Sequence, residues 1–457
     1  MLRVMNPYSG EMVCELPYDT EESVAQKLDS ARSAARAWRF VPLGERMERV
    51  AAALEFFRRE RESVALDITR QMGRPLAQAR GEVDGMLGRA ESMLAQAPEA
   101  LAPRILAPLE GLERSLVHEP LGTVVHLSAW NYPLLISVNV IVPALVAGNA
   151  VLLKHSGRTA LCGEHWRRAL AELPEGLFDT CVLDHPATAT LVQDPRVDHV
   201  AFTGSVGGGR AIQRALSERF IDAGLELGGN DPAYVAADQD LDWVAEQLVD
   251  GACYNAGQSC CAIERAYVEA PAYERFLSAA AKAMAGYRLG DPEEDGVNMG
   301  PLIDRRAVAE VARQVDQALA LGARRVYQGE VPSDAFYPPT LLADCPPGAD
   351  IMRTETFGPV LPVAIVADDP AALERMNDSD LGLTASVWTR DVERARWLAP
   401  RLEAGTVFLN RCDYLDPELA WTGYKDSGRG STLSVYGYQA LTRRKSVHFR
   451  LPSAPRG

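Results

Sequence analysis

The chain has 457 residues and a formal net charge of −15; 47% of its residues are hydrophobic and 24% are charged. This balance is typical of a globular protein of about two to four domains and excludes a disordered chain. An acidic chain lacks the broad basic face that nucleic acids and anionic membranes select, so we expect neither as a partner.

The N-terminal part, up to about residue 100, is predicted to be mostly helical. Asp19 and Thr20 can cap a helix whose apolar side chains share one face. The residues on this face are Val24, Leu28, Ala31, Ala35 and Trp38. Residues 46–97 continue in Ala, Leu, Glu and Arg, which are good helix formers.

Short β-branched runs then alternate with helical stretches. We expect strands at 122–127, 149–154 and 199–203, helices at 134–147 and 210–218, and a second such series from about 231 to 411. This alternation predicts parallel sheets with helices on both faces. Residues 120–153 carry no Asp, Glu, Lys or Arg, but Asn131, Pro133 and Asn139 interrupt them. The interruptions favour a buried strand–helix unit over a membrane span.

Signals of secretion and of metal binding are missing from the sequence. Residues 1–14 lack the apolar core of a signal peptide, and the eight cysteines form no C-x-x-C pair. We therefore expect reduced thiols, a cytoplasmic protein and no metal site.

The C-terminal segment differs from the rest in charge and pattern. No acidic residue follows Asp426, and residues 446–451 alternate as a strand does. An exposed terminal strand needs a partner edge, either in this chain or in another subunit. A solvated basic tail is the alternative, and the sequence does not separate the two.

Two positions could carry chemistry, and each has a structural alternative. Cys260, with Cys261 beside it, follows a glycine turn after the helical stretch 241–252, where backbone N–H groups could stabilise a thiolate nucleophile. A buried apolar cysteine would look the same. Glu226 stands in an apolar run before a glycine pair, where a raised pKa would suit a general base. A carboxylate that caps the glycine turn would fit equally well.

Two further segments lie at predicted strand ends, where open α/β sheets bind ligands. Asn131, in segment 129–133, has an amide that could donate to an oxyanion. The glycine-rich segment 202–209 suits a pyrophosphate at a helix N-terminus. It does not match G-x-G-x-x-G, so alone it is a weak dinucleotide signal.

Together, in this order and spacing, these segments resemble the aldehyde dehydrogenase superfamily over nearly the whole chain. Its specific signatures are LELGG at 225–229 and NAGQSC at 255–260, and ETFGP at 355–359 resembles its cofactor-contact motif. The resemblance implies an α/β fold with two Rossmann-type parallel-sheet domains and a small strand-built oligomerisation extension. The implied parts are a cofactor-binding domain at 1–110 and 124–228, a catalytic domain at 229–425, and oligomerisation strands at 111–123 and 440–457.

The resemblance also implies a mechanism with NAD or NADP as the cofactor. Cys260 would attack a small-molecule aldehyde, and Asn131 with the Cys260 N–H would hold the oxyanion. Glu226 would activate the water that hydrolyses the resulting thioester to a carboxylic acid. The implied cofactor-binding residues are Ser128, Trp130, Lys154, Gly204, Ser205, Glu355 and Phe357, and the implied substrate-tunnel residues are Tyr132, Tyr254 and Trp421. A homodimer or homotetramer is expected.

Three positions depart from the family pattern. Gly157 stands where many members have a glutamate that binds the adenosine ribose, so NADP could be accepted beside NAD. Asn230 replaces a lysine. Thr432 stands where many members have a late glutamate proposed to relay protons, which leaves Glu226 as the main candidate base.

The substrate and two alternative functions stay open at this point. Aromatic tunnel walls suit an aromatic or medium-chain aldehyde, Asp413 and Asp416 could favour a cationic amino-aldehyde, and Arg411 could pair with an acidic semialdehyde. One alternative function is a coenzyme A-acylating dehydrogenase, whose members typically lack the Glu226 equivalent. The other is a catalytically silent member with a binding role, against which the retained catalytic residues argue.

Overall fold

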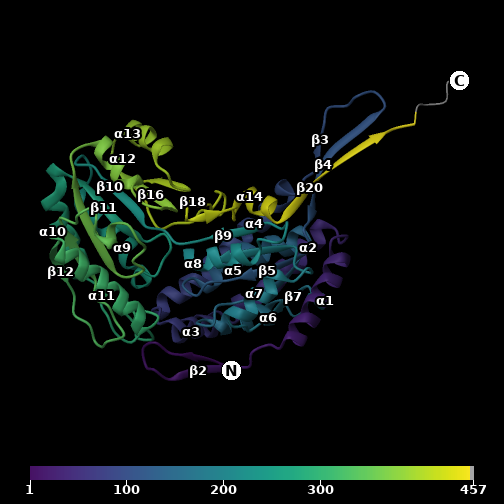
Figure 1. Ribbon diagram of the computed structural model, residues 1–457, viewed down its shortest axis with the longest axis horizontal. Helices are drawn as coiled ribbons and strands as arrows, with labels where there is room; N and C mark the ends of the chain where they lie inside the picture. Colours follow the sequence, from purple (N-terminus) through teal and green to yellow (C-terminus); the bar gives the residue numbers. More distant parts are fainter. Residues whose placement is uncertain (453–457) are drawn as a thin grey trace.

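The computed structural model describes residues 1–452. Figure 1 shows two α/β halves side by side, with an arm of strands that projects from one of them. Each half has its own sheet with mostly parallel strands and its own hydrophobic core. This architecture confirms the predicted fold class.

The first half is built around a six-stranded sheet in which five strands are parallel and one short edge strand is antiparallel. In spatial order the strands are β19 (Gly428–Arg429), β9 (Ala223–Glu226), β8 (His199–Thr203), β5 (Thr123–Leu127), β6 (Ala150–Lys154) and β7 (Phe178–Thr180). The helices of this half are α1 (Glu21–Trp38), α2 (Leu43–Arg59), α3 (Arg61–Met72), α4 (Leu76–Ala100), α5 (Pro133–Ala147), α6 (Ala160–Ala169), α7 (His185–Gln193), α8 (Val206–Ala215) and α14 (Ser434–Ala440).

The second half is built around a seven-stranded sheet, parallel except for one edge strand. In spatial order the strands are β12 (Arg324–Gln328), β13 (Thr340–Ala343), β14 (Val360–Val366), β11 (Ile263–Glu269), β10 (Asp231–Val235), β16 (Thr384–Trp388) and β17 (Thr406–Leu409). Its helices are α9 (Leu241–Cys253), α10 (Tyr273–Met284), α11 (Arg305–Ala320), α12 (Asp369–Asn377) and α13 (Val392–Leu398). Strands β15 (Leu381–Gly382) and β18 (Tyr424–Lys425) form a small separate pair.

The uncharged stretch of the sequence forms β5, α5 and β6. Helix α5 is buried on nearly every side, which explains why its residues are apolar all round rather than on one face. It ends at Gly148, whose φ of 104° is left-handed and favours glycine. Within residues 1–452, no helix is both long enough and apolar enough to cross a membrane.

The helical prediction for the N-terminal part is confirmed from α1 to α4. Thr20 caps α1 by accepting a hydrogen bond from the Ser23 N–H, and four of the five predicted apolar residues are buried. One element there was not predicted: β1 (Leu2–Met5) and β2 (Met12–Leu16) form an antiparallel hairpin ahead of α1.

The predicted start of the helix after the glycine-rich segment is wrong by four residues. Helix α8 begins at Val206, because the Ser205 hydroxyl caps it by accepting a hydrogen bond from the Gly208 N–H at 3.1 Å. The glycines therefore form the first helical turn and not a loop. At Gly209 a Cβ would lie 2.6 Å from Leu227 Cδ2, so glycine lets the helix approach β9 closely.

The projecting arm is a three-stranded antiparallel sheet of β20 (Thr442–Arg450), β4 (Leu112–Pro120) and β3 (Arg104–Ile105). The predicted terminal strand is confirmed, and its partner edge lies in the same chain. Residues 453–457, the end of the predicted oligomerisation segment, lie outside the described residues.

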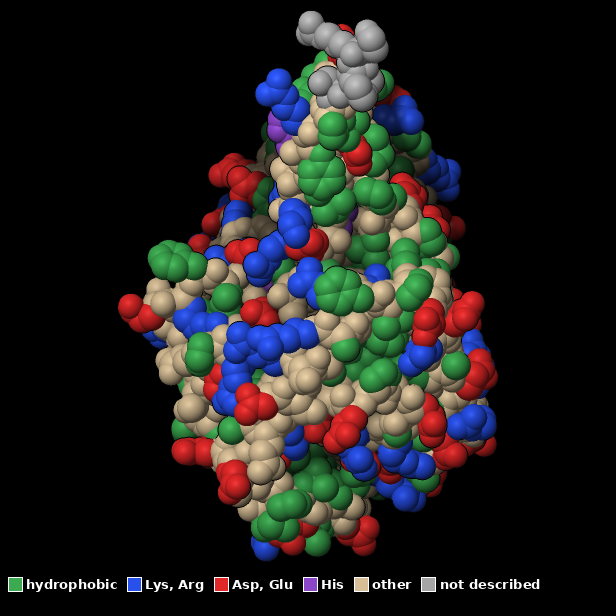
Figure 2. Space-filling view, turned by 90° about the vertical axis from the view of Figure 1, so that its right-hand side faces the viewer, with side chains coloured by type: hydrophobic (Ala, Val, Ile, Leu, Met, Phe, Trp, Pro, Cys, Tyr) green, Lys and Arg blue, Asp and Glu red, His purple; other side chains and the backbone are tan. Residues whose placement is uncertain are grey.

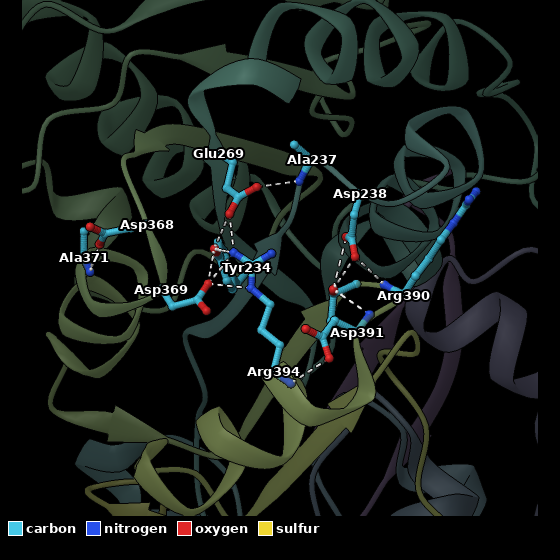
Figure 3. Close-up of polar contacts among 11 residues, drawn as sticks. Tyr234, Ala237, Asp238, Glu269, Asp368, Asp369, Ala371, Arg390, Asp391 and Arg394 are labelled. Atoms are coloured by element: carbon cyan, nitrogen blue, oxygen red, sulfur yellow. Dashed lines mark hydrogen bonds and ion pairs between the residues drawn. The ribbon is translucent and has the colours of Figure 1, made fainter.

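The carboxyl ends of the second sheet, where open α/β sheets usually bind ligands, are filled by a polar network (Figure 3). Arg394 forms ion pairs with Glu269 at the end of β11 and with Asp369 at the start of α12. The Tyr234 hydroxyl lies 2.8 Å from Glu269 Oε1 and 2.6 Å from Asp369 Oδ1. These side chains satisfy one another's hydrogen bonds and charges, so this end of the sheet is occupied by structural contacts.

Candidate active site

A cavity of about 560 Å³, hereafter the cofactor cavity, opens at the carboxyl ends of β5, β6 and β8. The structure brings all seven predicted cofactor-binding residues to its wall: Ser128, Trp130, Lys154, Gly204, Ser205, Glu355 and Phe357. They come from strand ends of the first sheet and from the loop before β14 of the second. The cavity therefore lies between the two halves.

The walls of the cofactor cavity suit a dinucleotide. The N-terminus of α8, with Gly204 and Ser205, offers backbone N–H groups and the positive end of a helix dipole to a pyrophosphate. A Cβ at Gly204 or Gly208 would lie 2.7 Å from the Phe202 ring, so a side chain at either position would require that ring to move. At the other end, the Trp130 and Phe357 rings meet edge to face at 5.7 Å.

A second cavity of about 620 Å³, hereafter the substrate cavity, meets the cofactor cavity at three shared residues, Cys260, Thr203 and Leu227. Its wall contains the three predicted tunnel residues Tyr132, Tyr254 and Trp421, together with Glu226. Cys260 is the one predicted catalytic residue that lines both cavities. A nucleophile at this junction could reach a substrate carbon on one side and deliver a hydride to the other.

Cys260 is held by a tight segment before it and a glycine pair opposite it. Asn255, Ala256 and Gly257 have consecutive positive φ angles of 53°, 56° and 74°. A side chain at Gly257 would collide with the backbone of Gly358, at 2.2 Å from its carbonyl oxygen. A Cβ at Gly229 would lie 2.2 Å from the Cys260 carbonyl oxygen. The glycines of both signatures thus allow three backbone segments to pack around one cysteine.

Cys261 has a different environment from Cys260. Its side chain is buried, with 2% of the residue exposed, and its thiol donates to Asp413 Oδ1 at 3.0 Å. A hydrogen bond with Cys260, together with burial, raises the pKa of Cys261. A protonated thiol is a poor nucleophile, so the structure favours Cys260 for that role.

Asn131 lies two residues before α5 and lines the cofactor cavity together with Cys260. Its side-chain amide donates to the Gln258 carbonyl at 3.2 Å, which fixes the amide next to the cysteine segment. Its own carbonyl oxygen accepts from Arg74 Nη2 and from Asn255 Nδ2. The amide has a second N–H, and this geometry leaves it available for an oxyanion formed at Cys260.

Glu226 ends β9 and is half-buried in the wall of the substrate cavity. Oε2 accepts a hydrogen bond from the Thr203 hydroxyl at 3.0 Å, and Oε1 accepts one from Thr432. Burial raises the pKa of Glu226, and both hydroxyls oppose that rise. The threonine at the position where many relatives have a glutamate therefore contacts the candidate base directly.

The loop that carries Glu355 and Phe357 is fixed by a buried carboxylate that the sequence did not single out. Glu264 accepts hydrogen bonds from the Thr356 and Phe357 N–H groups, each at 2.9 Å, and from the Asn230 amide at 3.1 Å. Burial raises the pKa of Glu264 to about 7. Asn230, which stands where the family has a lysine, is thus part of the support for the loop that carries Glu355 and Phe357.

An ion pair beneath the site was also not predicted. Arg74 and Glu82 form a fully buried pair. Glu82 accepts from the Leu134 N–H at 2.8 Å, and Arg74 Nε donates to Asn255 Oδ1 at 3.1 Å. The pair links the N-terminus of α5, which follows Asn131 in the chain, to the segment before Cys260. No local pattern in the sequence marks either residue, because the partners are distant in the chain.

Three residues considered for the substrate site have different outcomes. Asp413 lines the substrate cavity, whereas Asp416 and Arg411 do not. Arg411 is exposed and its guanidinium stacks on the Tyr414 ring at 3.3 Å. Gly157 does not line the cofactor cavity, and a Cβ there would lie 3.0 Å from Leu2 in β1.

Comparisons with known proteins agree with this geometry. The model of the aldehyde dehydrogenase family matches residues 1–447. The NAD(P)+-dependent succinate semialdehyde dehydrogenase of Escherichia coli is 34% identical over 447 residues, which are 97% of this chain and 96% of that protein. The 3,6-anhydro-alpha-L-galactose dehydrogenase of Streptomyces coelicolor is 34% identical over 463 residues, covering 98% and 93%.

A solved structure gives the same result for the fold. The succinic semialdehyde dehydrogenase of Streptococcus pyogenes, in complex with NADP+, superposes on this chain with a TM-score of 0.94 at 28% sequence identity. The match covers 98% of this chain and 100% of that chain. The chain therefore belongs to the aldehyde dehydrogenase family, and it is an NAD(P)-dependent oxidoreductase that oxidises an aldehyde to a carboxylic acid.

Proposed function

We propose that Cys260, Asn131 and Glu226 carry out this oxidation. The Cys260 thiolate attacks the aldehyde carbon, and the Asn131 amide with the Cys260 N–H stabilises the oxyanion. A nicotinamide held beside Trp130, Glu355 and Phe357 would supply the hydride acceptor for this oxidation, and loss of the hydride from the hemithioacetal carbon would leave a thioester on Cys260. Glu226 takes a proton from water, the water attacks the thioester carbonyl, and the acid leaves as Cys260 is restored.

The observation that carries this proposal is the position of Cys260 in the wall of both cavities. The cofactor cavity ends on one side of the thiol, and the substrate cavity with Glu226 ends on the other. Hydride transfer and hydrolysis thus have separate approaches to one carbon atom. We assign the cofactor-binding role to the first half of the chain and the catalytic role to the second, which supplies Cys260 and Glu355.

The cofactor cavity also supports the use of NADP. Lys154, Ser156 and His185 line it beside β6, and Glu355, at the opposite end, is its only acidic wall residue within the described chain. Since no carboxylate stands beside Lys154 in this wall to repel a 2′-phosphate, the positive charge of Lys154 can act on it. We therefore expect NADP to be accepted at least as well as NAD.

The experiment that tests the proposed function measures reduced-nicotinamide absorbance with aliphatic, aromatic, amino- and carboxy-aldehydes, each with NAD and with NADP. The expected result is oxidation with NADP of at least one class. The proposal would be contradicted if no aldehyde were oxidised although the cofactor bound, which is the result that a silent family member would give. A strong preference for NAD would contradict only the inference about Lys154.

A substitution at Thr432 tests the role of Glu226 as the general base through the pH dependence of deacylation. A base must be ionised to act, so deacylation should rise with pH through the raised pKa of Glu226. The Thr432 hydroxyl donates to the ionised carboxylate and lowers that pKa. Thr432→Val should therefore move the acid limb of deacylation to higher pH by about half a unit to one unit, the equivalent of one hydrogen bond.

A matched control for this variant is Thr422→Val. Thr422 lies in the same segment, and its hydroxyl donates to the Gly430 carbonyl at 2.8 Å rather than to Glu226. The control should leave the pH profile of deacylation in place. An unshifted profile in Thr432→Val would show that another group sets the acid limb.

We also propose that the arm joins subunits into a homodimer or homotetramer. Figure 2, viewed from the side of the arm, shows hydrophobic side chains along it. Ile105 is 71% exposed and Phe449 55%. Within residues 1–452 the outer edge of β20 has no strand partner. Sedimentation should give two or four times the chain mass of 49.7 kDa; a monomer at micromolar concentration would contradict this assignment.

A reducing compartment such as the cytoplasm fits the enzyme, because all eight cysteines are free thiols and Cys260 must stay reduced. Recovery of the active protein with disulfide bonds from an oxidising compartment would contradict this placement.

A further inference from the structure

We propose that Arg89 binds a carboxylate at the far end of the substrate and so makes the enzyme selective for short aldehydes that carry an acid group. This inference rests on the proposed function, because it assumes that the substrate cavity holds the aldehyde. It assigns to one side chain a preference that the fold alone does not determine.

Two arginines line the substrate cavity, and they differ in their partners. Arg74 is fully engaged by Glu82, Asn255 and the Asn131 carbonyl. Arg89, on α4, donates from Nη1 to the Leu135 carbonyl at 3.0 Å and to Asn139 Oδ1 at 3.1 Å. Among the described residues no carboxylate forms an ion pair with Arg89, and its Nε and Nη2 donate to no protein group. These two contacts hold one edge of the guanidinium against α5 and leave the other edge free for a ligand.

The acidic residues of the substrate cavity do not form an ion pair with Arg89, because other side chains hold them. Glu226 is held by Thr203 and Thr432, and Asp413 by Ser259 and Cys261. Burial raises the pKa of Glu226 and Asp250, and it raises that of Asp413 to about 6.

The charged groups of this wall differ in their direct partners. The carboxyl groups each have a hydrogen-bond donor of their own, whereas the Arg89 guanidinium is bonded only to the Leu135 carbonyl and the Asn139 amide oxygen, and Glu226 acts on it only through space. The charged group in this wall that lacks a directly bonded counter-ion is therefore a cation. Leaving a half-buried cation unpaired is costly, and a carboxylate on the substrate would satisfy it with two charge-assisted hydrogen bonds.

The position of Arg89 also limits the length of the substrate. Leu135 and Asn139 lie two and six residues after Pro133, the first residue of α5, that is, about 3 and 9 Å along the helix, and Asn131 precedes Pro133 by two positions. An aldehyde whose oxygen reaches Asn131 can place a carboxylate at that level only if a short carbon chain separates the two ends. Leu135, Ile136 and Trp421 supply apolar contacts for such a chain.

The same geometry disfavours the other substrate classes. A protonated amino-aldehyde of similar length would place its cation next to the Arg89 guanidinium. An uncharged aromatic or aliphatic aldehyde would leave the guanidinium without a counter-ion and would gain only contacts with the apolar wall.

The test compares kcat/KM for succinate semialdehyde, butanal and 4-aminobutanal in the wild-type enzyme and in Arg89→Met and Arg89→Lys. We expect the wild type to prefer succinate semialdehyde. Arg89→Met should lower kcat/KM for it by about a hundredfold, mostly through KM, and change butanal oxidation only a few-fold. Arg89→Lys should recover part of the loss, since an ammonium keeps the charge but not the paired hydrogen bonds.

Arg80→Met is the matched control. Arg80 lies on the same helix, lines neither cavity, and pairs with Glu62 at 2.8 Å on the surface. The Arg80→Met variant loses a cation from α4 but keeps the cavity wall unchanged. All three substrates should therefore be oxidised at the wild-type rate.

The inference is overturned if Arg89→Met affects butanal as much as succinate semialdehyde, or if the wild type prefers butanal or 4-aminobutanal. A second readout needs no turnover: the rate at which an alkylating reagent modifies Cys260, measured with and without succinate, shows whether bound succinate protects the thiol. If the wild type oxidised none of the aldehydes, the proposed function would fall. Succinate protection in the wild type but not in Arg89→Met would still support the role of Arg89, and equal protection in both would overturn it.

Discussion

Replacement of Cys260 by alanine is expected to abolish aldehyde oxidation, lowering kcat/KM by roughly four orders of magnitude or more. The hemithioacetal cannot form without the thiol, and no other cysteine lines both cavities within the described chain. Cofactor binding should be unchanged, because the walls around Ser205 and Lys154 do not involve the thiol. The measurement is steady-state turnover together with cofactor affinity.

The matched control is Cys261→Ala, which should keep most of the activity. The thiol of Cys261 is buried and hydrogen-bonded to Asp413, and Ser259 also donates to that carboxylate, so Asp413 keeps a partner in the variant. The reverse pattern, with Cys261 essential and Cys260 dispensable, would mean that the nucleophile is one residue further along the chain.

Glu226→Gln is expected to separate the two halves of the reaction. The amide has nearly the same shape but cannot take a proton from water, so hydride transfer should continue while deacylation slows by roughly a hundredfold to ten-thousandfold. Rapid mixing should then show a burst of reduced nicotinamide close to one equivalent per active site, followed by a stalled steady state.

The same variant distinguishes hydrolysis from acyl transfer to coenzyme A. A single slow phase without a burst would leave the base unidentified or place the slow step earlier. Formation of acyl-CoA at a rate that Glu226→Gln does not change would contradict the hydrolytic mechanism. The family comparisons and the carboxylate in the substrate cavity both favour hydrolysis.

The reactive positions could be predicted from the sequence because their constraints are local. Gly229 and Gly257 must be glycine, since a Cβ at either position would lie 2.2 Å from a backbone carbonyl oxygen, that of Cys260 or of Gly358, and such glycines form short recognisable runs. The alternation of strands and helices likewise follows from hydrophobic periodicity. For this reason the two sheets and the residues at their strand ends were predictable.

Residues that act across the chain could not be found in this way. Arg74 and Asn255 are 181 positions apart, and nothing near either one indicates the other. Arg89 lies in a helix whose sequence is compatible with a solvated face, and only packing against α5 reveals that it faces a cavity. The start of α8 was predicted too late because glycine is a poor helix former; here the Ser205 cap and close packing outweigh that propensity.

The central claim is that an acyl group is carried on Cys260 at the junction of the two cavities. The most direct test is the intact and peptide mass of Glu226→Gln after mixing with NADP and an aldehyde that the wild type oxidises. We expect the mass to rise by one acyl group, located on the peptide that contains Cys260, and no rise when the cofactor is omitted and the sample is acid-quenched. An unmodified Cys260, or an acyl group on Cys261, would contradict the account.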